Sequence, residues 1–277
     1  MIERFRHEAM NTTFDVAFAG VDRAEARHAA RAVFDLVDRL ERILSRFLPG
    51  SDVWQINAMR DGDCLRVRPE TIACLEIAAT CSEVTAGRFD IGVGSAMDSL
   101  REPAGGNDQP SDVTKGRLRI DRDRLEVACE RPGMRLDLGA VGKGFALDEA
   151  ARLLREDWEI GRVRLSASTS TILAMDPPEG EAGWTVGIET LELPLVHAAL
   201  SCSGTAQRGA HIVDPRTGKP GGNYERTWVR ATTAAVSDAL STGFMLMTPA
   251  EISHVVAESP GIEAWCSDGV GGLRHFS

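Results

Sequence analysis

Aromatic residues are scarce in this sequence. Phenylalanine, tryptophan and tyrosine make up 5% of the 277 residues, and tyrosine occurs once. So few rings argue against a surface on which nucleic-acid bases stack. Positive charge is also in deficit, because 31 lysines and arginines stand against 41 acidic residues and give a formal net charge of −10. This balance opposes non-specific attraction to nucleic acid or an anionic membrane. An anionic substrate would therefore depend on locally placed cations or on a metal ion.

Long apolar runs are absent as well. The sequence has no run resembling the ~20 apolar residues of a membrane span, and the N-terminal stretch MIERFRHEAMNTTF lacks the apolar core of a signal peptide. If Met1 is the true start, the sequence predicts a cytoplasmic protein without membrane insertion. The six cysteines are scattered and form no C-x-x-C pair, so we interpret them as reduced thiols rather than disulfides or a zinc site.

Apolar periodicity predicts a mixture of helices and strands. Apolar residues recur every three or four positions from Arg23 to Phe47, which predicts an amphipathic helix that ends near Pro49-Gly50. Further helices are predicted at 69–87, 142–154 and 234–247, a loop at 101–114, and strands at 14–18, 65–67, 118–120, 125–128, 135–138, 163–165, 184–188, 193–196 and 229–232. Because helices and strands do not alternate strictly, we predict an α+β fold with a mostly antiparallel sheet and packed helices, in one domain over 1–277.

Two oxygen-bearing side chains share a face of the helix predicted at 234–247. Asp238 and Thr242 stand at positions i and i+4 of AAVSDALSTGFMLM, whereas Val236, Leu240 and Phe244 belong to a separate apolar face. A carboxylate beside a hydroxyl suits Mg²⁺, which prefers oxygen ligands and retains waters or substrate phosphates. The alternative is an exposed aspartate and a threonine that bonds back to its own helix, because such pairs are common.

The segment LDLGAVGKGFALDEA has the features of an anion site. Asp137 ends a predicted strand, glycines allow the backbone to approach a ligand closely, and Lys143 lies at a helix start. Backbone N–H groups, the helix dipole and the lysine would together attract a phosphate. The spacing matches neither a Walker A run nor G-x-G-x-x-G, so it predicts no nucleotide fold by itself. The alternative is a glycine-rich turn with a solvated lysine.

One histidine has a context that could support catalysis. His211 precedes IVDPRTGKP, in which Pro215 and Gly218 predict a tight, ordered turn. A histidine held by such a turn could act as a general base near neutral pH. A lone histidine is also compatible with a purely structural role.

Taken in order, these segments resemble the FAD:protein FMN transferase (ApbE) family. The matching stretches are AMNTTFDVAF, SRFLPGSDVWQIN, GRFDIGVG, LDLGAVGKGFALDEAARLL, SGTAQRGAHIVDPRTGKP and TTAAVSDALSTGFML. Each is weak alone, but the ordered set covers most of the chain. The resemblance implies the T-fold-like α+β domain of that family. It also implies transfer of FMN from FAD to a Thr or Ser hydroxyl of an acceptor protein, with AMP as the other product.

The resemblance implies roles for individual residues. The FAD site would comprise Met10, Phe47, Arg88, Phe89, Asp90, Asp137, Lys143 and the backbone near Val213. Mg²⁺ would bind Asp238, Thr242 and the backbone carbonyl of Ala140. His211 would activate the acceptor hydroxyl.

The chain departs from the family at one place that matters. Where the family usually reads A-G-G-D or A-G-G-N after a strand, this sequence reads Ala167-Ser168-Thr169-Ser170. The loss of two glycines removes backbone freedom and adds side-chain bulk. Two alternatives to transfer therefore remain open, namely a non-catalytic FAD-binding or flavin-delivery protein and an enzyme that hydrolyses FAD to FMN and AMP.

Overall fold

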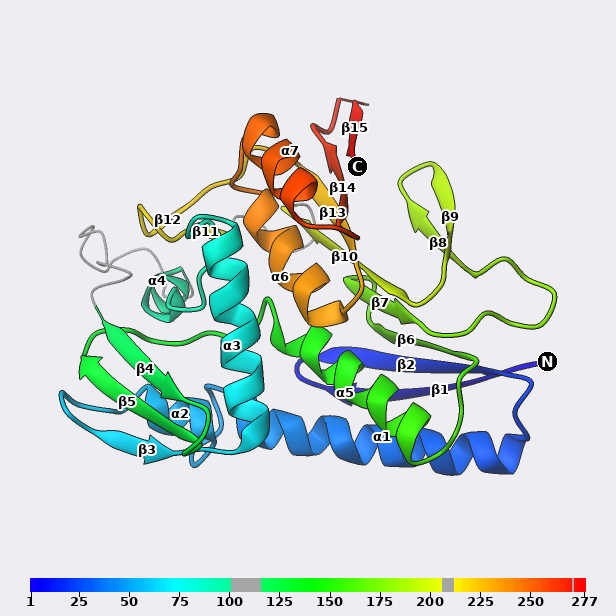
Figure 1. Cartoon of the computed structure of the whole chain (residues 1–277), viewed down its shortest axis with the longest axis horizontal. Coiled ribbons are helices and arrows are strands. Elements are labelled where there is room, and N and C mark those ends of the chain that lie inside the picture. Colours follow the sequence, from blue (N-terminus) through cyan, green and yellow to red (C-terminus); the bar gives the residue numbers. More distant parts are fainter. Residues whose placement is uncertain (101–115, 206–211, 271) are drawn as a thin grey trace.

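An eight-stranded sheet forms the centre of the computed structural model, which describes residues 1–100, 116–205, 212–270 and 272–277. Its order is β1-β2-β6-β7-β10-β13-β14-β15, and every neighbouring pair is antiparallel (Figure 1). The strands are β1 (Ile2–Ala9), β2 (Thr12–Ala19), β6 (Val163–Ala167), β7 (Thr171–Ala174), β10 (Ala198–Gly204), β13 (Arg226–Ala231), β14 (Glu263–Ser267) and β15 (Leu273–Phe276). The predicted α+β fold with a mostly antiparallel sheet is confirmed, whereas the loop predicted at 101–114 falls outside the described residues.

Both faces of this sheet are buried. Successive side chains of a strand point to opposite faces, and in β2 the residues Phe14, Val16 and Phe18 join the main core while Ala17 and Ala19 join a second apolar cluster. The main core lies under the helices. The second cluster lies under a hairpin of β8 (Trp184–Ile188) and β9 (Leu191–Leu195). In Figure 1, strand β10 lies between helix α6 and this hairpin.

Helices cover the other face. The helices α1 (Arg23–Leu44), α5 (Gly142–Glu156) and α6 (Ala234–Phe244) contact the sheet, and α3 (Pro69–Val84) packs against α6. Helix α1 begins where the Asp22 carboxylate accepts hydrogen bonds from the backbone of Ala24 and Glu25, and it ends at Leu44 instead of the predicted Phe47. Shorter helices are α2 (Asp52–Ile56), α4 (Gly94–Ser99) and α7 (Pro249–Glu258). None of the described helices has the length and apolar character required to cross a bilayer.

Smaller sheets complete the structure. Strands β3 (Cys64–Arg66), β5 (Glu126–Arg131) and β4 (Arg117–Asp121) form a three-stranded sheet in that order. Strands β11 (Val213–Asp214) and β12 (Lys219–Pro220) flank the tight turn predicted around Pro215, in which Gly218 adopts a φ of 67° and its N–H donates to the carbonyl of Asp214 at 2.8 Å.

One predicted strand is wrong, and its failure has a physical cause. The segment 135–138 forms a single parallel bridge, between Arg135 and Val93. The side chain of Asn57 takes both backbone groups of Leu136, donating to its carbonyl at 3.0 Å and accepting from its N–H at 2.6 Å. Arg135 and Asp137 exchange backbone hydrogen bonds with Gly94 and Ile91, so Asn57 keeps a second strand from pairing at Leu136.

Several elements were missed by sequence analysis. Helix α7 carries a readable signal, a capping box between Thr248 and Glu251 with Pro249 at the first helical position. Strand β1 reads IERFRHEA and is charged on alternate positions, as suits an edge strand that must discourage pairing with other chains. The partly polar strands β7 and β10 were also not predicted.

The strand ends define the part of the molecule that matters for function. The registers place Phe14 opposite Ala167, Thr171 opposite Ser201, and Gly204 opposite Arg226. The β1–β2 turn, the β6–β7 turn, the end of β10 and the start of β13 therefore lie along one edge of the sheet.

Candidate active site

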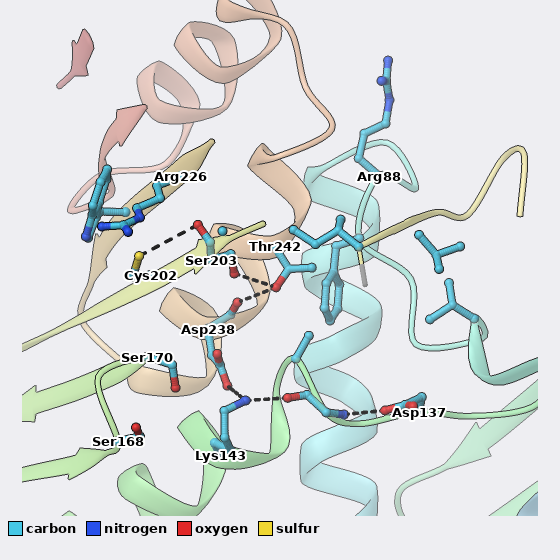
Figure 2. A pocket seen from close by; sticks show the side chains of 18 of the residues that line it. Arg88, Asp137, Lys143, Ser168, Ser170, Cys202, Ser203, Arg226, Asp238 and Thr242 are labelled. Carbon is cyan, nitrogen blue, oxygen red and sulfur yellow. Dashed lines mark hydrogen bonds and ion pairs between the residues drawn. The ribbon is translucent and has the colours of Figure 1, made fainter. Parts of the chain in front are cut away.

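A cavity of about 510 Å³ opens at this edge of the sheet. Its walls come from segments far apart in the sequence, namely 88–97, 137–143, the β6–β7 turn, the tip of the β8–β9 hairpin, the ends of β10 and β13, 212–215, and α6. Figure 2 shows Asp238, Lys143, Thr242 and Ser203 gathered within it.

The carboxylate of Asp238 is buried in this cavity. Its side chain is 5% exposed, which rules out the exposed aspartate considered from the sequence. Oδ2 accepts a hydrogen bond from the Gly144 N–H at 3.3 Å and lies 3.3 Å from Nζ of Lys143. Oδ1 accepts a hydrogen bond from the Thr171 hydroxyl at 3.2 Å. Three donors from two other elements thus hold the carboxylate.

Hydroxyl groups surround Thr242. The Thr242 oxygen lies 3.0 Å from Oγ of Ser203, which in turn lies 2.9 Å from Oγ of Ser241. The Thr242 hydroxyl also lies 3.4 Å from the carbonyl oxygen of Asp238, so bonding back to its own helix does occur. A hydroxyl that donates in this way keeps lone pairs on its oxygen. The residue therefore retains the capacity to act as a cation ligand.

The ammonium of Lys143 places a positive charge against the Asp238 carboxylate. Nζ lies between the carbonyl oxygen of Gly139, at 2.5 Å, and Asp238. Ala140 lines the same wall. Across the described residues there is no cluster of three or more His, Cys, Asp or Glu side chains placed to hold a metal. A divalent cation here would have one charged protein ligand, which suits Mg²⁺ because it completes its shell with waters and substrate phosphates.

A buried arginine positions Asp137, and sequence analysis missed it. The Arg46 side chain is 4% exposed, and its Nε lies 2.9 Å from Oδ2 of Asp137. Its Nη2 donates to Asp98 on α4 at 2.7 Å, and its guanidinium lies 4.6 Å from the ring centre of Phe47. Asp137 also accepts from the Gly139 N–H at 2.8 Å. Asp137 is thus fixed on both sides before any ligand binds.

The 88–90 segment contributes an apolar and an acidic side chain. Phe89 is buried, and its N–H donates to the Thr85 hydroxyl at 3.1 Å. Burial raises the pKa of Asp90, and a hydrogen bond from the Gly92 N–H offsets part of the rise. The guanidinium of Arg88 binds the carbonyl of Leu246 and the carboxylate of Glu251, and Figure 2 shows it directed away from the Asp238 group.

The β6–β7 turn forms the wall in which this chain departs from the family pattern. Ser168, Thr169 and Ser170 all line the cavity. Ser168 has a φ of 55°, in the left-handed region that favours glycine. The Ser170 hydroxyl donates to the carbonyl of Ala167 at 2.9 Å, which closes the turn. The hydroxyl-bearing residues therefore adopt a compact turn, with some strain at Ser168.

The cavity lining also includes two charged residues and a cysteine that sequence analysis did not identify. Glu189 at the tip of the β8–β9 hairpin, Cys202 and Arg226 line it. Burial raises the pKa of the Cys202 thiol to about 11, an effect that Arg226 partly opposes. The thiol is therefore protonated near neutral pH and is a poor nucleophile. No local motif marks these three positions, because they come from the β8–β9 hairpin and from two strands of the eight-stranded sheet.

Nine of the residues predicted from the sequence line this one cavity, Arg88, Phe89, Asp90, Asp137, Ala140, Lys143, Val213, Asp238 and Thr242. Among the residues that the structure describes, Met10 and Phe47 are not part of the lining. Met10 lies in the β1–β2 turn, partly buried against the core, and Phe47 is 60% exposed beside Arg46. His211 lies outside the described residues. The roles of all these residues remain predictions.

The fold matches that of solved structures. The chain superposes on the flavin transferase ApbE from Vibrio cholerae with a TM-score of 0.83 at 19% identity, covering 100% of this chain and 96% of that one. The ApbE protein from Thermotoga maritima gives the same TM-score at 22% identity, with 100% and 97% coverage. These likenesses establish a shared fold.

Sequence comparison gives the family itself. The ApbE family model matches residues 10–266, and the chain belongs to the ApbE family. It is 25% identical to the FAD:protein FMN transferase of Klebsiella pneumoniae, over 91% of this chain and 80% of that protein. It is also 25% identical to the FAD:protein FMN transferase of Treponema pallidum, over 87% and 77%. The family predicted from the ordered motifs is confirmed.

Proposed function

We propose that this protein is a Mg²⁺-dependent FAD:protein FMN transferase, which moves FMN from FAD onto a Thr or Ser hydroxyl of an acceptor protein and releases AMP. The observation that carries the proposal is the buried Asp238 carboxylate, which lies beside Lys143 and Thr242 in a cavity large enough for part of a dinucleotide. The names of the relatives support the same reaction.

The proposed reaction exchanges the phosphoanhydride bond of FAD for a phosphoester bond to the acceptor. The acceptor oxygen forms a bond to the flavin-side phosphorus, and the bond from that phosphorus to the AMP oxygen breaks. The hydroxyl proton passes to a base, for which His211 is our candidate. Bound Mg²⁺ would neutralise phosphate charge and stabilise the charge that develops on the leaving AMP.

In this proposal, residues of this chain bind FAD and align it for the reaction. Lys143 would pair with a phosphate oxygen, and Asp238, Thr242 and the carbonyl of Ala140 would hold the cation. Phe89 supplies an apolar wall for the flavin side. Because Arg46 already fixes Asp137, little side-chain ordering is needed at that wall when FAD binds.

One observation keeps a second candidate function in view. Ser168, with its strained backbone, and the side chains of Thr169 and Ser170 line the wall where the family usually has glycines. If this wall displaces the phosphates, the protein would bind FAD without efficient transfer, or would pass FMN to water.

The direct test is incubation of purified protein with FAD, Mg²⁺ and a peptide that carries a flavinylation motif. We expect the peptide to gain the mass of an FMN phosphoester and AMP to appear in equal amount. The reaction should stop when EDTA is added and resume with excess Mg²⁺. AMP and free FMN without a heavier peptide would indicate hydrolysis, and unaltered FAD that stays bound would indicate a binding protein.

The lysine provides a separate prediction about FAD binding. Lys143→Ala is expected to weaken FAD binding by about 10- to 100-fold, because a charge-assisted hydrogen bond contributes about 1.5–3 kcal/mol. Riboflavin lacks the phosphates, so its affinity should change by less than about threefold. Fluorescence titration of both ligands measures the difference, and Lys219→Ala, an exposed lysine on β12, is the matched control. Equal losses for both ligands would show that Lys143 acts through structure.

A further inference from the structure

Helix α6, which carries Asp238, is capped by a residue of another helix. The Asp148 carboxylate on α5 accepts hydrogen bonds from Ala234 N at 2.7 Å and from Ala235 N at 2.8 Å. Thr233 occupies the N-cap position but makes no capping bond with its side chain. Asp148 therefore satisfies two of the backbone donors that a helix start leaves unpaired.

A second contact joins the same two helices one turn further along. Gly144 lies four residues before Asp148 on α5, and Asp238 lies four residues after Ala234 on α6. The Gly144 N–H donates to Oδ2 of Asp238 at 3.3 Å. The antiparallel helices are thus joined at 148 with 234 and at 144 with 238, and residues four apart share a helix face.

The approach of the two helices is as close as their backbones allow. A Cβ atom at Gly144 would overlap the carbonyl oxygen of Ala234. Because Gly144 has no side chain, the first turn of α6 lies directly on α5. A change in the cap at Ala234 would therefore change how α6 packs on α5. Asp238 lies one helical turn after Ala234 on α6.

The charges of Asp148 and Asp238 also repel each other. Burial raises the pKa of Asp148 to about 6; the two backbone hydrogen bonds oppose this rise, and the nearby charges of Glu149 and Asp238 add to it. Asp148 itself does not line the cavity among the described residues. Its charge would add to the attraction for a cation held by Asp238 without any direct contact.

We propose that Asp148 is a positioning residue for the cation site, because it caps α6 and so holds the Asp238 carboxylate in the cavity. This inference rests on the cation site of the proposed function. It assigns Asp148 no contact with FAD, the metal or the acceptor.

The test measures Mn²⁺ binding to the full chain, without substrate, through the electron paramagnetic resonance of the free ion. Groups that hold a metal ligand in place typically affect metal affinity by about 10- to 100-fold. We expect Asp148→Ala to raise the Mn²⁺ dissociation constant about tenfold. Asp148→Asn retains one acceptor oxygen and loses the charge, so it should raise the constant about threefold. FAD affinity measured without metal should change by less than about twofold.

Asp22 provides a matched control, because its carboxylate also caps a helix through two backbone N–H groups. Asp22→Ala and Asp22→Asn should leave Mn²⁺ affinity unchanged. Loss of either cap should lower the melting temperature by a few degrees, about 2–4 °C for a domain of this size. Comparable melting shifts with different metal affinities would separate positioning from general stability.

The outcomes are distinguishable. If folded Asp148→Ala binds Mn²⁺ like the wild type, or if Asp22→Ala weakens binding as much, the inference is overturned. If Asp148→Ala does not fold, Asp148→Asn decides, and unchanged affinity in that variant overturns the inference. If Asp238→Ala binds Mn²⁺ as tightly as the wild type, the cation site itself is wrong and the role of Asp148 falls with it.

Discussion

Asp238→Ala is expected to reduce FMN transfer by at least about a thousandfold, which corresponds to a barrier increase of ~4 kcal/mol. Among the described residues, Asp238 is the one charged ligand that we propose for the cation. Asp238→Asn keeps the shape of the side chain; its one oxygen can still accept from the Gly144 N–H, and its NH2 group can donate to the Thr171 hydroxyl. It should therefore remain folded and lose nearly as much activity. Thr242→Val should lose about tenfold, since a neutral hydroxyl binds a cation more weakly than a carboxylate does.

The measurement is the rate of peptide flavinylation across a magnesium titration. Melting temperatures of the three variants serve as the control for folding. Equal rates for Asp238→Ala and the wild type at every magnesium concentration would rule out the cation site at this position.

Replacing Ser168-Thr169-Ser170 with Gly-Gly-Asp is expected to accelerate transfer by about 10- to 100-fold. Three side chains now line the wall past which the pyrophosphate would run. A displacement of about 1 Å at the reacting centre can cost about a hundredfold in rate, while binding through the flavin ring would survive. FAD affinity should therefore change little, and the gain should appear in the single-turnover rate with one acceptor peptide.

Two single substitutions distinguish the effect of backbone strain at residue 168 from the effect of side-chain bulk in the β6–β7 turn. Ser168→Gly relieves the left-handed conformation at φ 55° and leaves the other two side chains in place. Glu159→Gly relieves a similar conformation, at φ 53° and exposed on the surface, so it should raise stability slightly without changing the rate. If the triple variant reacts no faster than the wild type, the turn does not limit this protein.

Local patterns in the sequence predicted much of the site. The i and i+4 spacing of Asp238 and Thr242 placed them on one helix face, and the structure puts both in the cavity with Lys143. The prediction of a tight turn around Pro215 was also correct, because turn residues determine their geometry within a few positions. The family resemblance then joined motifs that no local pattern could connect.

The missed residues depend on contacts that are remote in sequence. Arg46 stands in the matched stretch SRFLPGSDVWQIN, but nothing local in that stretch indicates its role, which exists only because the fold brings Asp98 and Asp137 to it. Glu189 and Arg226 meet at the cavity through two different sheets. The segment predicted as a strand at 135–138 forms a single bridge with Val93, and Asn57, almost eighty positions earlier, takes the backbone groups of Leu136.

The cavity is built from residues far apart in the sequence, and this determines when it can form during folding. Gly144 and Asp238 are 94 positions apart, and Arg88 reaches Leu246 across 158 positions. Contacts of such separation form late, because the entropy of closing long loops must be overcome first. During synthesis the N-terminal strands and α1 can form early, but the proposed cation site around Asp238 cannot form before α6 has left the ribosome. Only the fully folded chain could therefore bind the ligand. Binding would stabilise that state relative to incompletely folded chains.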